Sequence, residues 1–367
     1  MRKRLLYYCY LFIVTCLLLE LALRIYNPFH FTVKANSIVL TANKTYTIYN
    51  NSIPVLPPVA THTKNSLGFR GANKPHSFSN YLSIITVGGS TTECYYLHDT
   101  ATWSFQLQQK LHQNFSHLWL NNAGLAGHST YGHQLLLCDY IVQLKPKVVL
   151  FLTGINDVTR TDLTESDKSN IKSAYKNPGS FLSQNSELCN VVLNLMRSRK
   201  AAINQLQDTY IDLAATRNDT LVLSQPFIDS VLHNETDLLP AYQQRLQNLI
   251  NTCRINQIIP VFITQPSLFG LGADPLTHVN LETYKLEDKR NGKLFWQRLE
   301  LYNRATKAVC ATEKIHCIDL ANSLPKNSAF FYDRVHFTND GAKAVAQIVH
   351  QNLFQYLAAQ FPQHVKH

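Results

Sequence analysis

Four short polar motifs occur in this chain in a fixed order, and their residue types are those that acyl transfer requires. They are residues 88–92 (GGSTT), 122–127 (NAGLAG), 154–157 (GIND) and 333–336 (DRVH). Each alone is weak evidence, because glycine, serine and asparagine gather at turns of every kind. Together they contain a serine nucleophile, amide donors for an oxyanion, a histidine base and a carboxylate that orients the base.

Ser90 stands where an expected strand passes into an expected helix. The apolar, β-rich run 82–87 and two glycines precede it, and residues able to open a helix follow it. Such a turn exposes a side chain above the sheet, and the free N–H groups of a helix N-terminus favour a developing negative charge. A helix cap and a phosphate-binding loop are the other roles for this serine alone. A P-loop is excluded because the Gly-Lys-Ser/Thr ending is missing.

His336 is the candidate base, because Asp333 precedes it by three residues in a loop before the last expected helix. In a short loop the carboxylate can bind one ring nitrogen while the other nitrogen faces Ser90. The carboxylate then fixes the tautomer and stabilises the imidazolium that forms when the serine loses its proton. The chain order serine, aspartate, histidine therefore predicts a catalytic triad.

The elements that must position these residues alternate between strand and helix. Strands are expected at 82–87, 117–121, 147–153, 259–264 and 316–320, and helices at 103–111, 131–144, 241–256, 295–312 and 340–354. This alternation predicts an α/β fold in which a five-stranded parallel sheet has helices on both faces. Ligands of such sheets bind outside the carboxyl ends of the strands. All four motifs fall at those ends or in the loops beyond them.

The four motifs resemble the sequence blocks of the SGNH hydrolases, the GDSL-like lipase and esterase superfamily, and the likeness extends over about residues 65–355. The resemblance implies a flavodoxin-like three-layer α/β/α sandwich. It also implies an oxyanion hole made by the backbone N–H groups of Ser90 and Gly127 and by the side-chain amide of Asn156. The residue before the serine is often aspartate in that superfamily, and here it is Gly89.

The N-terminal segment has the composition of a membrane-spanning helix. Residues 5–19 are apolar or aromatic apart from Thr15 and two cysteines, Glu20 interrupts the run, and residues 21–23 extend it. About 20 residues cross a bilayer, so residues 5–23 suffice if Glu20 lies near the interface. The basic residues before the run place the N-terminus in the cytoplasm and the rest outside. No small-residue cleavage site follows, so a retained signal anchor is expected, with a cleaved signal peptide as the alternative.

The chain is expected to have three parts. A signal anchor occupies residues 1–27, an extended and turn-rich lead-in occupies 28–80, and a catalytic domain occupies 81–357. Polar insertions at about 158–238 and 267–293 interrupt the strand and helix rhythm of the catalytic domain. We expect the first insertion to lie over the active-site end of the sheet.

Composition and charge limit the partners. Beyond Arg2–Arg4 at the N-terminus, the basic residues that give the net charge of +10 are scattered, so no nucleic-acid partner is predicted. No Cys-x-x-Cys or His-x-x-x-His pattern occurs, and neither a metal nor a cofactor is expected. Cys310 and Cys317 either form a disulfide or remain ordinary buried thiols. Asp157 is expected to be structural, and Arg70 to pair with a buried carboxylate.

The leading hypothesis is a single-pass membrane protein whose extracytoplasmic domain is a serine esterase. It would cleave an acyl ester of a glycan or lipid through an acyl-enzyme on Ser90. One alternative is an O-acyltransferase acting on extracytoplasmic polysaccharide, in which a sugar hydroxyl replaces water. The other is a non-catalytic glycan-binding or assembly protein on the same fold. The polar insertions favour short acyl groups on glycans over long-chain lipids.

Overall fold

The protein is described from a computed structural model, which covers residues 2–29, 33–34, 37–158, 185–203, 210–216, 219–286 and 290–366. The chain divides into two compact units. One consists of Met1–Thr41 and Glu165–Gln207, and the other of Ala42–Thr164 and Asp208–His367. The second unit holds all four sequence motifs, and the first holds the N-terminal helix.

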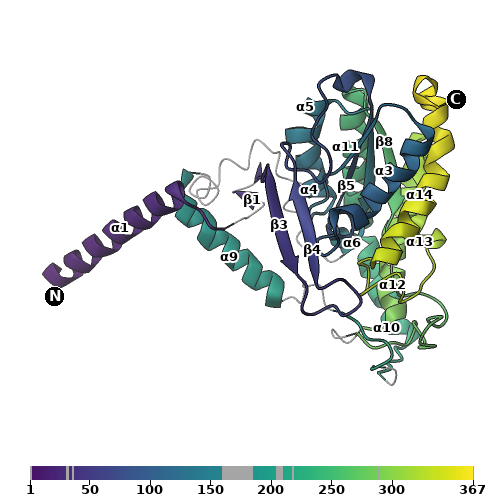
Figure 1. Ribbon diagram of the computed structural model, residues 1–367. Helices are drawn as coiled ribbons and strands as arrows, with labels where there is room; N and C mark the ends of the chain where they lie inside the picture. Colours follow the sequence, from purple (N-terminus) through teal and green to yellow (C-terminus); the bar gives the residue numbers. More distant parts are fainter. Residues whose placement is uncertain are drawn as a thin grey trace. The chain divides into compact units, whose positions relative to one another are not determined.

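A parallel sheet of five strands forms the centre of the second unit (Figure 1). Its strands are β5 (Leu82–Gly88), β6 (Leu118–Asn122), β7 (Val148–Thr153), β8 (Ile259–Thr264) and β9 (Cys317–Ile318). Their spatial order is β6-β5-β7-β8-β9, which is the flavodoxin-like order. Ile84, Val148 and Ile259 lie side by side in the register. The α/β fold with a parallel sheet, predicted from the sequence, is confirmed.

Helices cover both faces of this sheet. α3 (Trp103–Asn114) and α14 (Asn339–Gln360) pack on each other and on the face that carries Ile84 and Leu150. α4 (Thr130–Leu136), α11 (Leu239–Ile255) and α12 (Gly292–Glu313) pack together on the other side. On that face Phe151 stacks on Phe262, with ring centroids 5.2 Å apart. Every β5 and β7 side chain is buried, as a central parallel strand requires.

Shorter elements connect this framework. The helices α2 (Ser90–Glu93), α5 (Val142–Leu144), α6 (Ile155–Val158), α10 (Gln225–Thr236) and α13 (Leu320–Ser323) have four, three, four, twelve and four residues. A π turn covers Leu137–Ile141, and 3₁₀ turns cover Phe78–Asn80, Asp99–Ala101 and Pro362–His364. The strand expected at 316–320 ends at Ile318, because α13 begins at Leu320. Cys310 and Cys317 are free thiols.

The segment 28–80, expected to be extended, contains a hairpin at residues 44–64. β3 (Lys44–Tyr49) and β4 (Val59–Lys64) pair antiparallel. The loop between the two strands contains Pro54 and the pair Pro57-Pro58. These prolines are the reason that the sequence predicts an extended, turn-rich segment here. The Asn50 side chain closes this connection by donating to the Ile53 carbonyl at 2.8 Å. The alternation in β4 buries Ala60 and His62, which anchors the hairpin.

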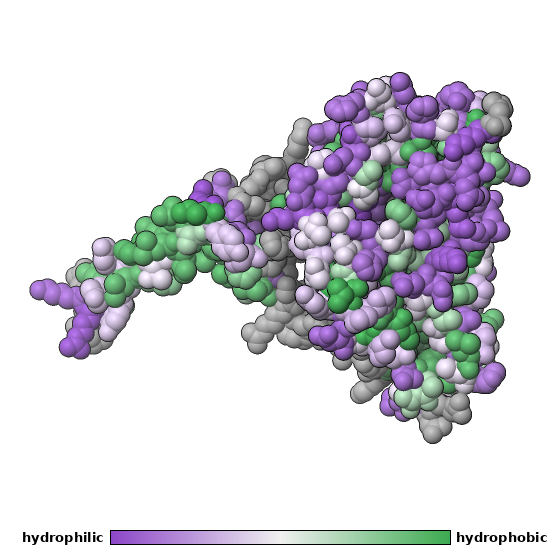
Figure 2. All heavy atoms as spheres, viewed as in Figure 1, coloured by the Kyte–Doolittle hydropathy of each residue, from purple (hydrophilic) through white to green (hydrophobic). Residues whose placement is uncertain are grey.

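The first unit contains α1 (Arg2–Ile25), α9 (Glu187–Ile203) and a small antiparallel pair, β1 (Val33–Lys34) with β2 (Ser37–Ile38). Within α1, Lys3–Ile25 is long and apolar enough to cross a membrane, and none of its most apolar window is buried. Figure 2 shows this helix with a largely hydrophobic surface. Of the expected insertion 158–238, residues 159–184, 204–209 and 217–218 lie outside the described residues.

A buried ion pair fixes the segment that follows β7. Asp157 of α6 is fully buried, and its carboxylate accepts hydrogen bonds from the Thr130 N–H at 3.2 Å and the Thr130 hydroxyl at 2.6 Å. Arg245 of α11 donates to the same carboxylate at 3.3 Å and to the Thr130 hydroxyl at 2.7 Å. Asp157 therefore ties the turn after β7 to α4 and α11.

Replacing Arg245 leaves the Asp157 carboxylate buried without its cation, which is strongly destabilising in protein interiors. We expect Arg245→Met to lower the free energy of unfolding by about 3 kcal/mol. The control is Arg254→Met on the same helix, because Arg254 is 45% exposed in its pair with Glu313. Such a surface pair contributes less than about 1 kcal/mol. Urea unfolding of the detergent-solubilised protein measures both, and equal losses would contradict the assignment.

Candidate active site

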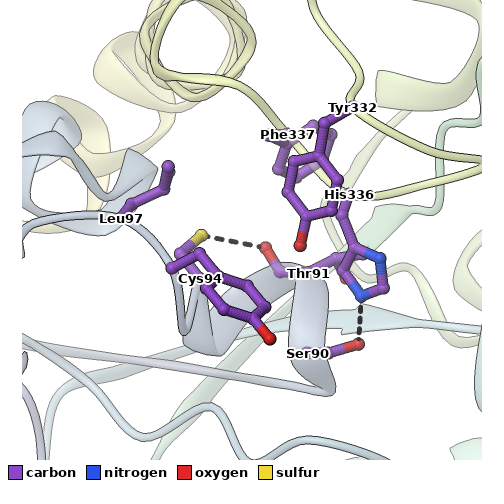
Figure 3. Close-up of a pocket in the computed structure, with 8 residues that line it drawn as sticks. Ser90, Thr91, Cys94, Leu97, Tyr332, His336 and Phe337 are labelled. Atoms are coloured by element: carbon purple, nitrogen blue, oxygen red, sulfur yellow. Dashed lines mark hydrogen bonds between the residues drawn. The ribbon is translucent and has the colours of Figure 1, made fainter. Parts of the chain in front are cut away.

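The loops beyond the sheet bring Ser90 and His336 together (Figure 3). Nε2 of the His336 ring lies 2.7 Å from Oγ of Ser90, although 246 positions separate the two residues in the chain. Nδ1 of the same ring lies 2.6 Å from Oδ2 of Asp333. The three residues that the sequence suggested as a triad therefore lie in one hydrogen-bonded line.

Two glycines let neighbouring elements approach Ser90 closely. Ser90 is the first residue of α2, directly beyond β5. A Cβ atom on Gly89 would lie 2.3 Å from Nδ2 of Asn156, and one on Gly88 would lie 2.1 Å from Oγ1 of Thr92. The side chains of Asn156 and Thr92 already occupy the space that these two Cβ atoms would need. The glycine before the serine thus makes room for the Asn156 amide beside it.

Asp333 holds the His336 ring in place. Its Oδ1 accepts the backbone N–H groups of Val335 at 2.9 Å and His336 at 2.8 Å, which leaves Oδ2 for the ring. Burial favours the neutral acid, but the His336 charge and these hydrogen bonds outweigh it and hold the pKa of Asp333 below its usual value. The Tyr332 ring stacks on the imidazole with centroids 5.5 Å apart. Asp333 is therefore an anion at neutral pH beside an oriented imidazole.

Asn156 presents its amide next to the serine. It lies in the short helix α6 after β7, where Asp157 is held by Arg245. Its Nδ2 donates one hydrogen bond to the His128 carbonyl at 2.9 Å. A side-chain amide has two N–H donors, so this bond fixes the orientation of the group while a second donor stays available. The structure brings Asn156 to the serine, as the sequence suggested.

Gly127 lies in the loop after β6, in the left-handed backbone region with φ of 73°. A side chain there would be strained. Two bonds hold this loop against the end of β5 and α2: Leu125 N–H donates to the Gly88 carbonyl at 3.0 Å, and Ala126 N–H to Oε2 of Glu93 at 2.8 Å. The loop that carries Gly127 is therefore fixed to the segment that carries Ser90.

Glu93 is a site residue that its place in the sequence does not reveal. It is 8% exposed, and its Oε1 lies 3.6 Å from Nζ of Lys64 in the β3/β4 hairpin. The one feature of the sequence that points to Glu93 is its position directly after the serine motif at residues 88–92. Because Glu93 also binds Ala126, the hairpin and the Gly127 loop share one buried carboxylate.

Arg70 fixes the chain just beyond Ser90. The buried guanidinium donates to the backbone carbonyls of Glu93 at 2.7 Å, Cys94 at 2.9 Å and Leu97 at 2.8 Å. It also pairs with Asp99 at 2.8 Å, whose side chain is 25% exposed. The carboxylate partner expected from the sequence is thus present but partly exposed. Arg70 therefore acts mainly as a hydrogen-bond donor to three backbone carbonyls in the segment that follows the candidate nucleophile.

A small pocket opens beside the serine and histidine (Figure 3). It is partly open to the surface, and Ser90 and His336 form part of its lining. The other walls are mainly apolar or aromatic and come from Cys94, Tyr96, Leu97, Tyr332 and Phe337. An acyl group attached to Ser90 would find this apolar space next to it.

Comparisons with known proteins identify the family of the chain. The sequence profile of the GDSL-like lipase/acylhydrolase family matches residues 86–344, which include all four motifs. No curated protein sequence matches the chain. Among solved structures, the chain is similar to Axe2, an acetylxylan esterase from Geobacillus stearothermophilus, with 13% identity over 74% of this chain and 93% of that one and a TM-score of 0.41.

Two further solved structures are similar at the same low level of identity. A lipase/acylhydrolase from Enterococcus faecalis is 12% identical over 75% of this chain and 96% of that one, with a TM-score of 0.41. A GDSL-like lipase from Bacteroides thetaiotaomicron VPI-5482 is 12% identical over 78% and 93%, with a TM-score of 0.38. The profile match alone spans well over half of the sequence. The chain belongs to the GDSL-like lipase/acylhydrolase family and is a hydrolase of ester bonds.

Proposed function

We propose that the protein is a serine esterase in which Ser90 is the nucleophile, His336 the general base and Asp333 the residue that orients the base. The observation that carries this proposal is the continuous line of hydrogen bonds from Asp333 through the imidazole to Ser90, with distances of 2.6 and 2.7 Å. This is the geometry that activates a weak serine nucleophile.

In the first half of the reaction, Ser90 Oγ attacks the ester carbonyl carbon while its proton passes to Nε2 of His336. The negative charge that develops on the carbonyl oxygen is stabilised by the N–H groups of Ser90 and Gly127 and by the Asn156 amide. The anionic Asp333 stabilises the imidazolium. The tetrahedral species then collapses, and the alcohol leaves with the proton from His336.

In the second half, a water molecule attacks the acyl group on Ser90. His336 takes a proton from this water and returns it to Ser90 Oγ as the ester bond to the enzyme breaks. The products are the free acid and the regenerated serine. No cofactor takes part in these steps, which the residues of the chain are sufficient to perform.

We infer that the acyl part of the substrate is short. The pocket beside Ser90 is small, and the buried side chain of Leu97 forms part of its wall. Its size favours a small acyl group such as acetyl, whereas a long fatty chain would need a groove that continues away from Ser90. A glycan that carries short acyl esters is therefore the substrate class we propose.

We further propose that α1 anchors the enzyme in a membrane with the catalytic unit on the extracytoplasmic side. The support is the length and apolar surface of Lys3–Ile25 together with basic residues at positions 2–4, directly at its N-terminal end. Positive charges beside a span favour the cytoplasmic side. The chain beyond α1 then faces the periplasm, lumen or exterior.

Removing the serine hydroxyl tests the proposed nucleophile. We expect Ser90→Ala to lower kcat for 4-nitrophenyl acetate by at least about 10³-fold, because no covalent intermediate can form. Ser323→Ala removes an exposed hydroxyl at the end of α13 and should leave kcat unchanged. Labelling with a fluorophosphonate should follow the same pattern. A Ser90→Ala protein that keeps a tenth of the activity would contradict the mechanism.

Enlarging the pocket tests the inference about acyl length. Leu97→Ala should raise the ratio of kcat/KM for butyryl over acetyl esters about tenfold, since each methylene in an apolar pocket is worth about that factor or more. The control is Leu107→Ala, because Leu107 is equally buried but does not line the pocket. A ratio that stays constant in Leu97→Ala, or that shifts equally in both variants, would show that the pocket does not hold the acyl group.

A further inference from the structure

The end of α1 is joined to the start of α9 by hydrogen bonds centred on Glu20. Oε2 of Glu20 accepts the Ser186 hydroxyl at 2.7 Å and the Leu188 N–H at 3.0 Å, and Oε1 accepts the Glu187 N–H at 3.1 Å. Arg24 of α1 donates to Oε1 of the same carboxylate at 2.8 Å. Glu20 thus caps the N-terminus of α9, where a negative charge is favourable.

This junction explains why a carboxylate can interrupt the apolar run. An unsatisfied charge within lipid is costly, but Glu20 lies near the C-terminal end of α1 and has four hydrogen-bond donors. Hydrogen bonds between the two helical segments join residues 20–27 to residues 185–188. Figure 1 shows α9 leaving this point at a wide angle to α1. The start of α9 is therefore held where the apolar run ends.

The described part of α9 buries two asparagines and exposes several apolar side chains. Asn190 and Asn194 are each only 6% exposed, and the Asn194 side chain donates to the Asn190 carbonyl and side-chain oxygens at 2.9 Å. Val192, Leu195 and Met196 are 48%, 50% and 64% exposed. Their spacing of three and four residues places these apolar side chains on one face of the helix. The buried side of α9 thus holds Val191 and the two asparagines, and its exposed side is apolar.

We propose that the exposed face of α9 formed by Val192, Leu195 and Met196 lies in the interface of the bilayer that α1 spans. The proposal rests on the membrane anchor proposed above. The occupant is a lipid surface because the capped junction places α9 at the end of the span. The sequence of the helix continues with three basic residues, Arg197, Arg199 and Lys200, which complement anionic headgroups. A helix held in this way would also fix the tilt of α1.

The test uses the full chain in vesicles of phosphatidylcholine and phosphatidylglycerol. An environment-sensitive fluorescent amino acid is incorporated singly at one of three exposed apolar positions: Phe12 in α1, Leu195 in α9 or Ile255 at the end of α11. Brominated phosphatidylcholine then serves as a quencher in the lipid phase. We expect quenching at Phe12 and Leu195 to exceed that at Ile255 by at least about twofold. Glu20→Leu, which removes the cap, should reduce quenching at Leu195 and leave Phe12 unchanged.

The outcomes separate this proposal from the anchor on which it rests. Quenching at Phe12 with no more quenching at Leu195 than at Ile255 would overturn the proposal and leave the anchor standing. A second copy of the chain or another protein on this face would give that result, because it would shield Leu195 from lipid. Absence of quenching at Phe12 would reject the anchor, and the interfacial helix with it. Both outcomes are read from quenching alone, so a failure of the proposed esterase activity would affect neither of them.

Discussion

One buried carboxylate sets the geometry of the whole site. Asp333 accepts two backbone N–H groups with one oxygen and the His336 ring with the other, so neither side chain is free to turn. The lowered pKa of Asp333 keeps it charged in a buried position. Without that charge the imidazole would lose both its orientation and its stabilisation when protonated. The approach of the ring to Ser90 follows from this one constraint.

Other buried charged residues position the rest of the site. They lie outside the hydrogen bonds that join Asp333, His336 and Ser90. Arg70 satisfies the carbonyls that follow Ser90, and Glu93 holds the loop of Gly127. Arg245 neutralises the aspartate next to Asn156. Parallel strands supply the framework, because their carboxyl ends meet at one edge of the sheet. These polar contacts hold the loops in place beyond the sheet, which the sheet by itself does not do.

The sequence predicts the sheet well, because β5 and β7 are mainly apolar runs and each is followed by a motif of glycine and polar residues. Residue type and spacing in the sequence also identify Ser90, Asp333 and His336 as candidate site residues. The hairpin at 44–64 is missed because its prolines lie in the connecting loop rather than in the strands. Glu93 and the cap formed by Glu20 are missed for another reason. Their partners are distant in the chain, and no local pattern marks a carboxylate that accepts a backbone N–H from a remote segment.

The most direct test of the central claim is to trap the covalent intermediate. The full-length enzyme is mixed with 4-nitrophenyl acetate, quenched in acid within the first turnover and digested, and its peptides are examined by mass spectrometry. The account predicts one acetyl group, carried by the peptide that contains Ser90 and located on that serine. Steady hydrolysis with no acetyl group on Ser90, or with the acetyl group on another side chain, would contradict it.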